Sequence, residues 1–324
     1  MTYYSVILHL VGLSNINRNA SANNEVNKYM YNFINMVNYV EPKSFLMENA
    51  PTLISRGKVI LDYLVSTLGS EYYIIILRDY AGNHEVPMKR QRTMILGFKK
   101  EICLGIPELN YESHRVTVGD IFAKFDDKIS VSEDELVPER TCKDLEQFYG
   151  QVSPGESIMT ALAKYSKESL QLMGVPEDKV KTIIKLKEKL EAGKGAFEKS
   201  PSRLKLDSVA PSLASVIEFI HPAYNRPLTV REYARLMGYP EEFEFVNDSK
   251  APYIQCIAQG VPVNFVKWAA TNIKEILEGK HEFNFEIKDL EQQTIEFINA
   301  CNPEKIIRRT FSKDSFNQSD NICK

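Results

Sequence analysis

The sequence lacks several features that mark whole classes of protein. Its five cysteines are spread over 324 residues without a Cys-x-x-Cys pair, and its five histidines show no metal-ligand spacing. These absences argue against a zinc site and a disulfide framework, and they favour reduced thiols. No apolar stretch is long enough to span a bilayer, and the opening residues lack the basic leader and cleavage site of a signal peptide. The expectation is a cytoplasmic protein without a metal.

Net charge does not identify a partner either. The formal net charge is −3, so any affinity for DNA must come from a local basic surface. One segment, from Lys164 to Lys205, is locally basic, with eleven Lys or Arg against six Asp or Glu. A solvated helix face is the simpler interpretation of such a segment. The hydrophobic content of 44% is that of a globular protein, and 324 residues allow one or two domains.

The first hundred residues alternate between helix and strand patterns. The expected elements are helices over residues 27–40 and 57–68 and strands over 44–49, 72–79 and 92–100. The last two strands lie close enough in sequence to pair. This alternation predicts an α/β sheet.

The rest of the chain is less regular. A short strand and turn is expected over 116–122, followed by helical structure over 156–198 that breaks at Gly174, and by helices over 229–237, 264–277 and 287–300. Thr229 with Glu232 three residues later predicts a capping box at the start of one of these helices. No internal repeat or low-complexity tract is present.

Four stretches occur in a fixed order. They are FLMENAP (45–51), VPMKRQRTMILGF (86–98), RPLTVREYARLMGYPEEFEF (226–245) and YIQCIAQGVPVNFVKWAATNI (253–273). Each is similar to one of the later motifs of the DNA cytosine-5 methyltransferase family, and the third is highly specific. The resemblance covers roughly residues 12–277.

The resemblance implies an α/β fold. The expected architecture is a partial S-adenosylmethionine-dependent methyltransferase (Rossmann-like) sheet with a smaller target-recognition domain. The implied divisions are a truncated catalytic α/β domain (1–100), a target-recognition region (101–207), the end of the recognition domain with the return to the catalytic domain (208–280), and a helix and tail (281–324). Periodicity alone indicates only an α/β protein with an irregular insertion.

The resemblance also implies catalytic roles. In this family a cysteine thiolate adds to carbon 6 of a cytosine that has been flipped out of the duplex. Glu48 would hold the ring at N3 and the exocyclic amine, with Asn49 positioning the loop. Arg90 would stabilise the adduct and support the flipped nucleotide, and Arg92 would brace Arg90 or the catalytic loop.

The third stretch would contribute to binding of double-stranded DNA. Thr229, Arg231, Glu232 and Arg235 would organise the recognition domain and reach phosphates. Without the resemblance, Glu232 and Arg235 are interpreted as a helix-surface pair.

The fourth stretch would close the pocket for the cofactor, S-adenosylmethionine. Gln259, Val261 and Pro262 are the implied cofactor-binding residues. Two departures from the family pattern stand nearby. Ala258-Gln259 replaces Gly-Asn, and Met88 replaces a glutamine.

Two early motifs of the family are missing. The Phe-x-Gly-x-Gly turn that holds the cofactor does not occur. The residues from Gly12 match the family's sequence after its Pro-Pro-Cys loop, yet Leu8, His9 and Leu10 stand in that loop's place. Leu10 cannot act as a nucleophile, so the chain is expected to be inactive alone, with an incomplete cofactor pocket.

Two explanations compete for this absence. Residues 1–11 can be encoded by codons whose shifted reading frame, starting at each third base, encodes a strand that ends in Pro-Pro-Cys. The Cys of this alternative frame is in register with Leu10, which indicates a frameshift. A natural two-subunit enzyme is the alternative, in which an upstream-encoded subunit carries the cofactor domain and the cysteine. The chain would then be an enzyme subunit, a non-catalytic DNA-binding remnant, or an inert fragment with an exposed apolar sheet edge.

Overall fold

A computed structural model of the protein describes residues 28–103, 115–123, 143–194, 200–213, 218–245 and 253–280. These residues form two compact units. The first unit comprises the residues up to 83, those from 91 to 103 and those from 266 onward, and the second comprises 84–90 and the residues from 115 to 265. Leu10, the segment that follows it and the helix expected over 287–300 lie outside the described residues.

The first unit is built on a three-stranded sheet. Its strands β1 (Ser44–Asn49), β2 (Tyr72–Tyr80) and β3 (Gln91–Lys99) lie in the order β1-β3-β2, with β3 antiparallel to both neighbours. β1 and β2 therefore run in the same direction, and their carboxyl ends lie at the same end of the sheet. The chain between them forms α2 (Leu53–Arg56) and α3 (Lys58–Leu68). These strands and α3 confirm the predicted elements to within one residue at each end.

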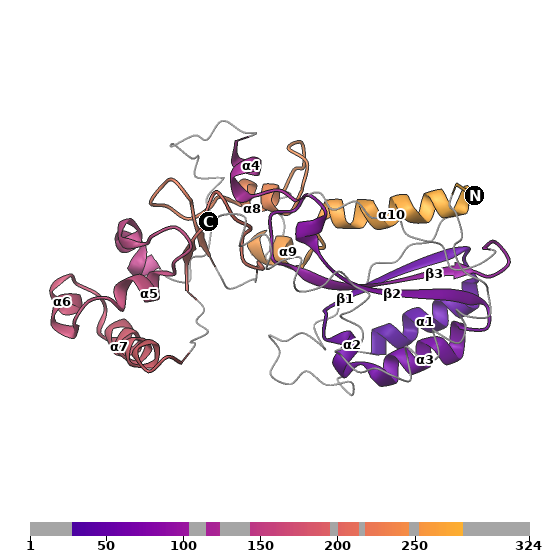
Figure 1. Cartoon of the computed structure of the whole chain (residues 1–324), viewed down its shortest axis with the longest axis horizontal. Coiled ribbons are helices and arrows are strands. Elements are labelled where there is room, and N and C mark those ends of the chain that lie inside the picture. Colours follow the sequence, from indigo (N-terminus) through magenta and orange to yellow (C-terminus); the bar gives the residue numbers. More distant parts are fainter. Residues whose placement is uncertain are drawn as a thin grey trace. The chain divides into compact units, whose positions relative to one another are not determined.

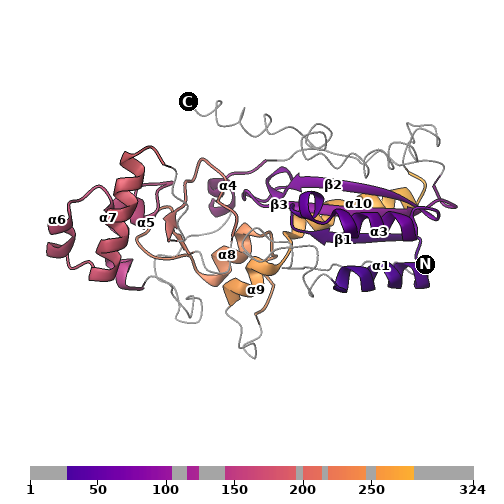
Figure 2. The same ribbon diagram turned by 90° about the horizontal axis from the view of Figure 1, so that it is seen from below.

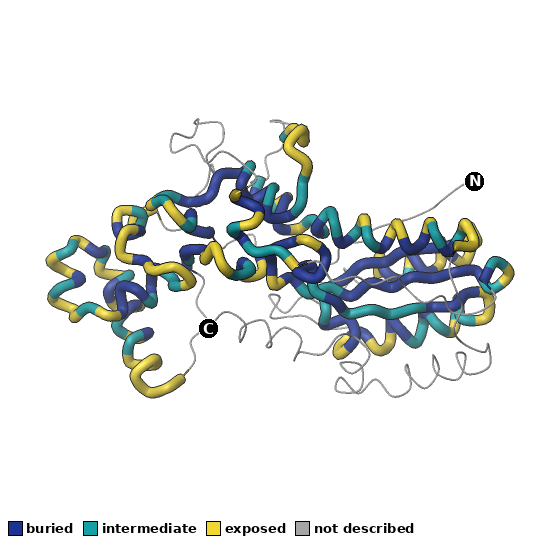
Figure 3. The backbone as a smooth tube through the Cα atoms, turned by 45° about the horizontal axis from the view of Figure 1, so that its top comes forward, coloured by how far each residue is buried: buried dark blue, intermediate teal, exposed yellow. Residues whose placement is uncertain are grey.

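Helices cover both faces of this sheet. Phe45 and Met47 of β1 pack with Ile95 of β3 into a core that α1 (Lys28–Val40) and α3 complete. Figures 1 and 2 show α1 and α3 on this face and α10 (Val263–Leu277) on the other, where the part of α10 from residue 266 onward belongs to this unit. Figure 3 shows the strands as the most buried part of the unit. The sheet is thus the middle layer of three, as in other α/β proteins.

α1 confirms the helix predicted over 27–40. Its buried residues recur at helical spacing: Met30, Phe33, Ile34 and Val37. The helix stops at Val40, and Glu41 takes a left-handed backbone conformation (φ 49°) just before Pro42. Spacing sets the buried face of α1, and the turn before the proline sets its end.

The second unit consists mainly of short helices. They are η5 (Lys143–Gln151), α4 (Val118–Phe122), α5 (Ile158–Leu162), α6 (Lys167–Leu172), α7 (Glu177–Glu191), α8 (Val230–Leu236) and α9 (Tyr253–Gln259), with a two-stranded parallel sheet of β4 (Ser202–Arg203) and β5 (Phe219–Ile220). The break predicted at Gly174 is confirmed, and Gly174 has a φ of 79°. A second break precedes α6, where the Ser166 hydroxyl accepts from the backbone N–H of Ser169 (3.1 Å). Among the helices of the described segments, none combines the length and apolar character that crossing a membrane requires.

The strand predicted over 116–122 is wrong. Val118–Phe122 is the helix α4, and Thr117 caps it. The Thr117 hydroxyl accepts from the Asp120 N–H (3.1 Å), while the Asp120 carboxylate accepts from the Thr117 N–H (2.7 Å). The alternation in Val-Thr-Val suggests a strand, but this reciprocal capping box starts a helix at the same residues.

The sheet core leaves no room at Gly97. Phe45 lies directly opposite Gly97 in the β1–β3 register, and a Cβ atom at Gly97 would overlap the Phe45 ring. We expect Gly97→Ala to lower the free energy of unfolding by about 1–3 kcal/mol through overpacking, measured by urea denaturation. Phe45→Leu should relieve the overlap, so the double variant should lose less than the sum of the two single variants. Strict additivity would contradict this account of the contact.

Candidate functional site

β1 ends in two polar residues that point to opposite faces of the sheet. Glu48 and Asn49 are each 1% exposed. Asn49 Nδ2 donates to the sulfur of Met30 on α1 (3.6 Å), and Asn49 Oδ1 accepts from the N–H of Ala50 (2.8 Å). Glu48 precedes Asn49 in the strand and therefore projects to the opposite face. Asn49 ties the end of β1 to α1, whereas Glu48 faces away from α1.

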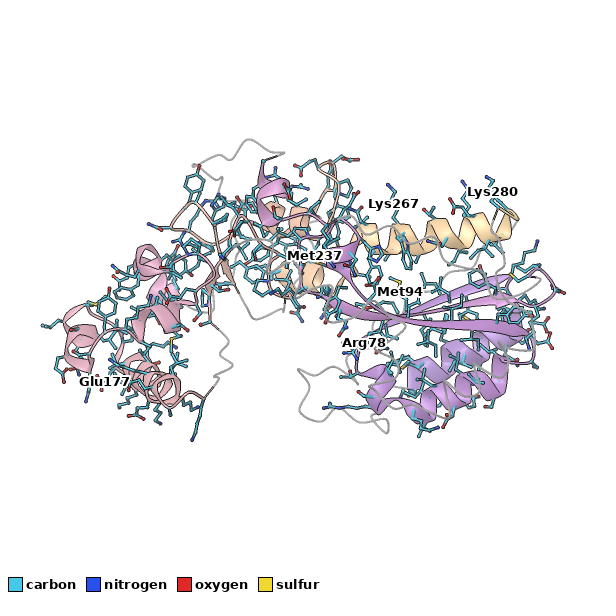
Figure 4. All side chains as sticks on the ribbon, viewed as in Figure 1. Arg78, Met94, Glu177, Met237, Lys267 and Lys280 are labelled. Carbon is cyan, nitrogen blue, oxygen red and sulfur yellow. The ribbon has the colours of Figure 1, made fainter. Side chains whose placement is uncertain are left out.

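Glu48 forms a buried ion pair with Arg92. The Arg92 Nε lies 2.8 Å from the Glu48 Oε1, and the two side chains are 13% and 1% exposed. Glu48 lies opposite Met94, which Figure 4 labels, so Arg92 is its diagonal neighbour on the same face of the sheet. Burial lowers the pKa of Arg92, and the charge of Glu48 counteracts that shift. The guanidinium expected to brace Arg90 or a loop thus contacts the carboxyl group of Glu48.

A third charged residue completes this end of the sheet. Asp79 lies near the end of β2, directly opposite Arg92 in the register. Its Oδ1 accepts from the N–H of Tyr80 (2.6 Å) and from Asn83 Nδ2 (2.7 Å). Glu48 and Asp79 therefore stand on either side of Arg92, at the carboxyl ends of two strands that run in the same direction. Ligands of open α/β sheets bind at such ends.

Sequence reasoning misses Asp79 as a site residue. The signal that identifies it is an acidic residue near the end of a buried strand, the same signal that identifies Glu48. Asp79 is 7% exposed, so its carboxyl group belongs to the interior rather than to the solvated surface. The carboxyl ends of β1 and β2, with the start of β3, form the candidate site of the first unit.

Arg90 belongs to the second unit and is 1% exposed. Its Nη1 donates to the carbonyl of Leu213 (3.1 Å), and its Nη2 donates to the carbonyls of Ala258 (2.6 Å) and Gly260 (2.8 Å). These bonds hold the turn after α9 in place. The geometry is that of a structural cross-link between distant backbone segments.

The segment that carries Arg90 is fixed along its length. Lys89 donates its N–H to the carbonyl of Ala210 (2.8 Å), and Ala210 donates its N–H to the carbonyl of Pro87 (2.7 Å). Met88, which stands where the family has a glutamine, is fully buried, and its sulfur accepts from the N–H of Leu213 (3.4 Å). A sulfur acceptor thus occupies this position in place of an amide.

The capping box predicted at the start of α8 is confirmed. The Thr229 hydroxyl accepts from the Glu232 N–H (3.1 Å), and the Glu232 carboxylate accepts from the Thr229 N–H (2.8 Å). Arg226 donates to both carboxylate oxygens of Glu232, each at 2.8 Å. Burial raises the pKa of Glu232, but the bonds from Arg226 and Thr229 outweigh it, and the net pKa lies below the ordinary value.

The interpretation of Glu232 and Arg235 as a pair is wrong. The capping box turns the Glu232 carboxylate back toward the start of α8, away from Arg235. Arg235 instead donates from Nε and Nη2 to the two carboxylate oxygens of Glu241, each at 2.9 Å. The guanidinium of Arg231 lies over the Phe245 ring, 5.4 Å from its centroid. The side chains expected to reach phosphates therefore also make contacts within the unit.

His221 is a buried residue that sequence reasoning did not single out. It is 0% exposed, and its Nδ1 accepts from the N–H groups of Ala223 (3.0 Å) and Tyr224 (3.1 Å). Its Nε2 lies 3.7 Å from a carboxylate oxygen of Glu232. Burial lowers the pKa of His221 to about 4, with Glu232 opposing the shift and two nearby arginines adding to it. The imidazole is therefore neutral at pH 7.

The expected cofactor residues lie around the turn between α9 and α10. Gln259 ends α9 and is exposed, Val261 is half-buried, and Pro262 is buried. Between them, Gly260 offers its carbonyl to Arg90. The structure thus places Gln259 at the end of α9 and the other two residues in the turn that Arg90 holds.

A sequence model of the C-5 cytosine-specific DNA methylase family matches residues 12–275. The chain belongs to this family. The match confirms the family expected from the four stretches and spans both units of the structure. The α/β fold predicted for the first hundred residues is confirmed by the three-layered sheet of the first unit.

Relatives of this DNA methylase chain include proteins from two archaea. The Type II methyltransferase M.MthTI of Methanothermobacter thermautotrophicus is 23% identical over 258 residues, covering 78% of this chain and 72% of that protein. The putative type II methyltransferase M.MJ0563P of Methanocaldococcus jannaschii is 30% identical over 261 residues, covering 78% and 68%. A crystal structure of a putative DNA modification methyltransferase encoded within a prophage of E. coli matches with a TM-score of 0.53 at 23% identity, covering 79% of this chain and 75% of that chain. This likeness supports the fold of the DNA methylase chain.

Because Arg90 donates to three carbonyls, we expect the stability of the protein to depend on its guanidinium. In Arg90→Lys, a single ammonium cannot serve acceptors at Leu213, Ala258 and Gly260 together. We expect a loss of about 2–4 kcal/mol in unfolding free energy, because buried acceptors are left unpaired. Arg56→Lys, at an exposed position on α2, is the control and should change little. Equal urea midpoints for the two variants would refute the cross-link.

The buried imidazole predicts a pH-dependent stability. Unfolded His221 takes up a proton near pH 6.5, whereas the folded residue resists it until about pH 4. The stability from this residue is therefore present above about pH 6.5 and is lost as the pH falls toward about 4, by about 3 kcal/mol in total. His221→Asn keeps an acceptor for the two backbone N–H groups and does not titrate, so its unfolding free energy should fall less over this range. Parallel pH profiles for the two proteins would exclude His221 as the source.

Proposed function

We propose that this DNA methylase chain holds the target cytosine and contacts double-stranded DNA, but does not transfer a methyl group on its own. The observation that carries the proposal is the buried Glu48–Arg92 pair at the carboxyl end of β1, in a chain with Leu10 where the family has its nucleophile. Base holding and nucleophilic attack are separate tasks, and this chain has residues for the first of them.

The chemistry of cytosine explains why a buried carboxyl group is needed. Carbon 5 is a poor nucleophile until a thiolate adds to carbon 6 and creates an enamine. The base must first leave the duplex, and its Watson–Crick edge then offers N3 and the exocyclic amine for hydrogen bonding. Glu48 is proposed to hold these groups, while Arg92 fixes the orientation of its carboxyl group at Oε1 (2.8 Å). Asn49, bonded to Met30 and Ala50, positions the end of the strand.

Arg90 is proposed to act as a positioning residue. Both of its Nη atoms donate to backbone carbonyls, and these bonds support the turn that contains Gln259, Val261 and Pro262. Thr229, Arg231 and Arg235 organise the end of the recognition domain through their contacts around α8. Residues 101–207 are proposed as the target-recognition region itself.

The cofactor pocket is proposed to need more than the residues of this sequence. S-adenosylmethionine is the methyl donor of the family and would supply the methyl group to carbon 5. Gln259, Val261 and Pro262 are proposed to lie against it, but the chain has no Phe-x-Gly-x-Gly turn. Under this proposal, methyl transfer needs this turn and a Pro-Pro-Cys loop in addition to residues 1–324, and the two-subunit enzyme is one way to supply them.

Leu10 favours one further candidate function. A leucine side chain cannot add to carbon 6, so a chain that binds DNA without modifying it is consistent with the same residues. Such a non-catalytic DNA-binding protein would show salt-sensitive binding to duplex DNA, because phosphate contacts release counterions.

The first test is incorporation of labelled methyl groups into duplex DNA. The purified chain should show none, and an upstream-encoded protein carrying the early motifs should restore it when the two are mixed. In that mixture, Glu48→Gln should lower the rate by about 10²–10⁴-fold, the range for a positioned catalytic side chain. Glu71→Gln, at an exposed position before β2, is the matched control and should leave the rate unchanged.

Each outcome of that test has a distinct meaning. Methylation by the chain alone would overturn the proposed inactivity. Salt-sensitive DNA binding without methylation in any mixture would support the non-catalytic function. Full activity of Glu48→Gln would remove Glu48 from the proposed site.

A further inference from the structure

Two consecutive helices of the second unit, α6 and α7, are joined by a short turn. α6 and α7 are joined by the four residues 173–176, and Gly174 in this turn has a φ of 79°. Two helices joined by a turn of this length with a glycine are the motif that many proteins use to enter the major groove of DNA. Glu177, labelled in Figure 4, begins α7, which is the second and longer helix of the pair.

The turn is held by a shared apolar core. The core joins both helices to α5 and η5. Figure 1 shows α5, α6 and α7 as neighbours. Leu170 of α6, Val175 of the turn and Val180 and Ile183 of α7 are all buried in it. Because these residues fix one face of α7 against the core, the opposite face is presented to solvent in a defined orientation.

That exposed face of α7 carries a row of lysines. Lys181, Lys185 and Lys189 follow one another at intervals of four residues and are all exposed. An interval of four places the side chains on one face of a helix, and three of them cover about 12 Å of its axis. Within the described parts of the chain, no carboxylate lies within 4.0 Å of any of the three Nζ atoms.

The acidic residues at the start of α7 have other contacts. Glu177 accepts a hydrogen bond from Gln171 Nε2 (3.2 Å), and the Asp178 carboxylate lies 3.5 Å from Lys179 Nζ. The three lysines of the row therefore keep their charge available for an external anion.

We propose that α6, the turn and α7 form a DNA-binding helix–turn–helix in which Lys181, Lys185 and Lys189 contact phosphates of duplex DNA. The major groove is about 12 Å wide and admits an α-helix. In this proposal, α7 approaches the groove with its exposed face, from which the long lysine side chains reach the phosphates. The inference deepens the proposed function, on which it rests for the identity of the DNA substrate. It gives the locally basic segment around α7 a specific task.

The experiment is a titration of a fluorescent DNA duplex with the full chain at several salt concentrations. Each lysine on a phosphate contributes about 0.9 to the slope of log K against log salt. The triple variant Lys181→Gln/Lys185→Gln/Lys189→Gln should therefore lose about 2–3 from this slope and bind about tenfold or more weakly at low salt. The substitutions lie on exposed positions, so circular dichroism should match the parent chain.

A charge-matched triple variant is the control. Lys267→Gln, Lys274→Gln and Lys280→Gln remove the same charge from exposed positions in and after α10, and the slope should stay near that of the parent. The Lys→Arg triple variant on α7 should retain the parent slope, because arginine also binds phosphate.

Three results would overturn the inference, and they are distinguishable. If the parent chain binds duplex DNA and the α7 variant binds with the same slope, the helix–turn–helix assignment fails while the proposed DNA binding stands. If the parent chain does not bind duplex DNA at low salt, both fail. A loss of slope equal to that of the control variant would show a general charge effect and would also refute the assignment.

Discussion

The guanidinium of Arg90 is the constraint on which the end of the second unit depends. It binds three backbone carbonyls that lie between 123 and 170 residues later in the chain. A buried cation is costly unless its donors find acceptors, and here both Nη atoms donate to carbonyl oxygens. The turn after α9 therefore takes its final form only when Arg90 is in place, and this turn separates the two last helices that the structure describes.

A second arginine works in the same way within the second unit. Arg203 donates to the carbonyls of Val152, His221, Tyr224 and Tyr149 and to the side chain of Asn225. Short helices leave many backbone carbonyls without a hydrogen bond inside the helix. A guanidinium, which is planar and has five N–H donors, can bind several of these carbonyls at once. The same need explains why Glu232, Arg226 and Thr229 bond to one another. Several charged residues of the family motifs are thus parts of the interior.

At the end of the sheet in the first unit, a charged side chain contacts another charged side chain rather than backbone carbonyls. Glu48 and Arg92 are held together by the antiparallel register of β1 and β3, and Asp79 stands opposite Arg92 on β2. A strand end of this kind fixes a carboxyl group rigidly, as recognition of one base requires. In the proposed function, this carboxyl group holds the target cytosine of the C-5 cytosine-specific DNA methylase family. In the same proposal, Leu10 at the place of the nucleophile separates this holding function from nucleophilic attack.

The sequence by itself determined the family, the strands of the first unit, α1 and the capping box of α8, because these depend on local spacing and on specific residue order. It misled at 116–122, where the side chain of Asp120 decided between strand and helix. Only the tertiary structure decided which charges meet. Glu48 contacts Arg92 through strand register, Glu232 contacts Arg226 rather than Arg235, and Arg90 binds carbonyls far along the chain. The partner of a buried charge depends on which distant segments pack together in the folded chain. Local sequence patterns do not specify this packing.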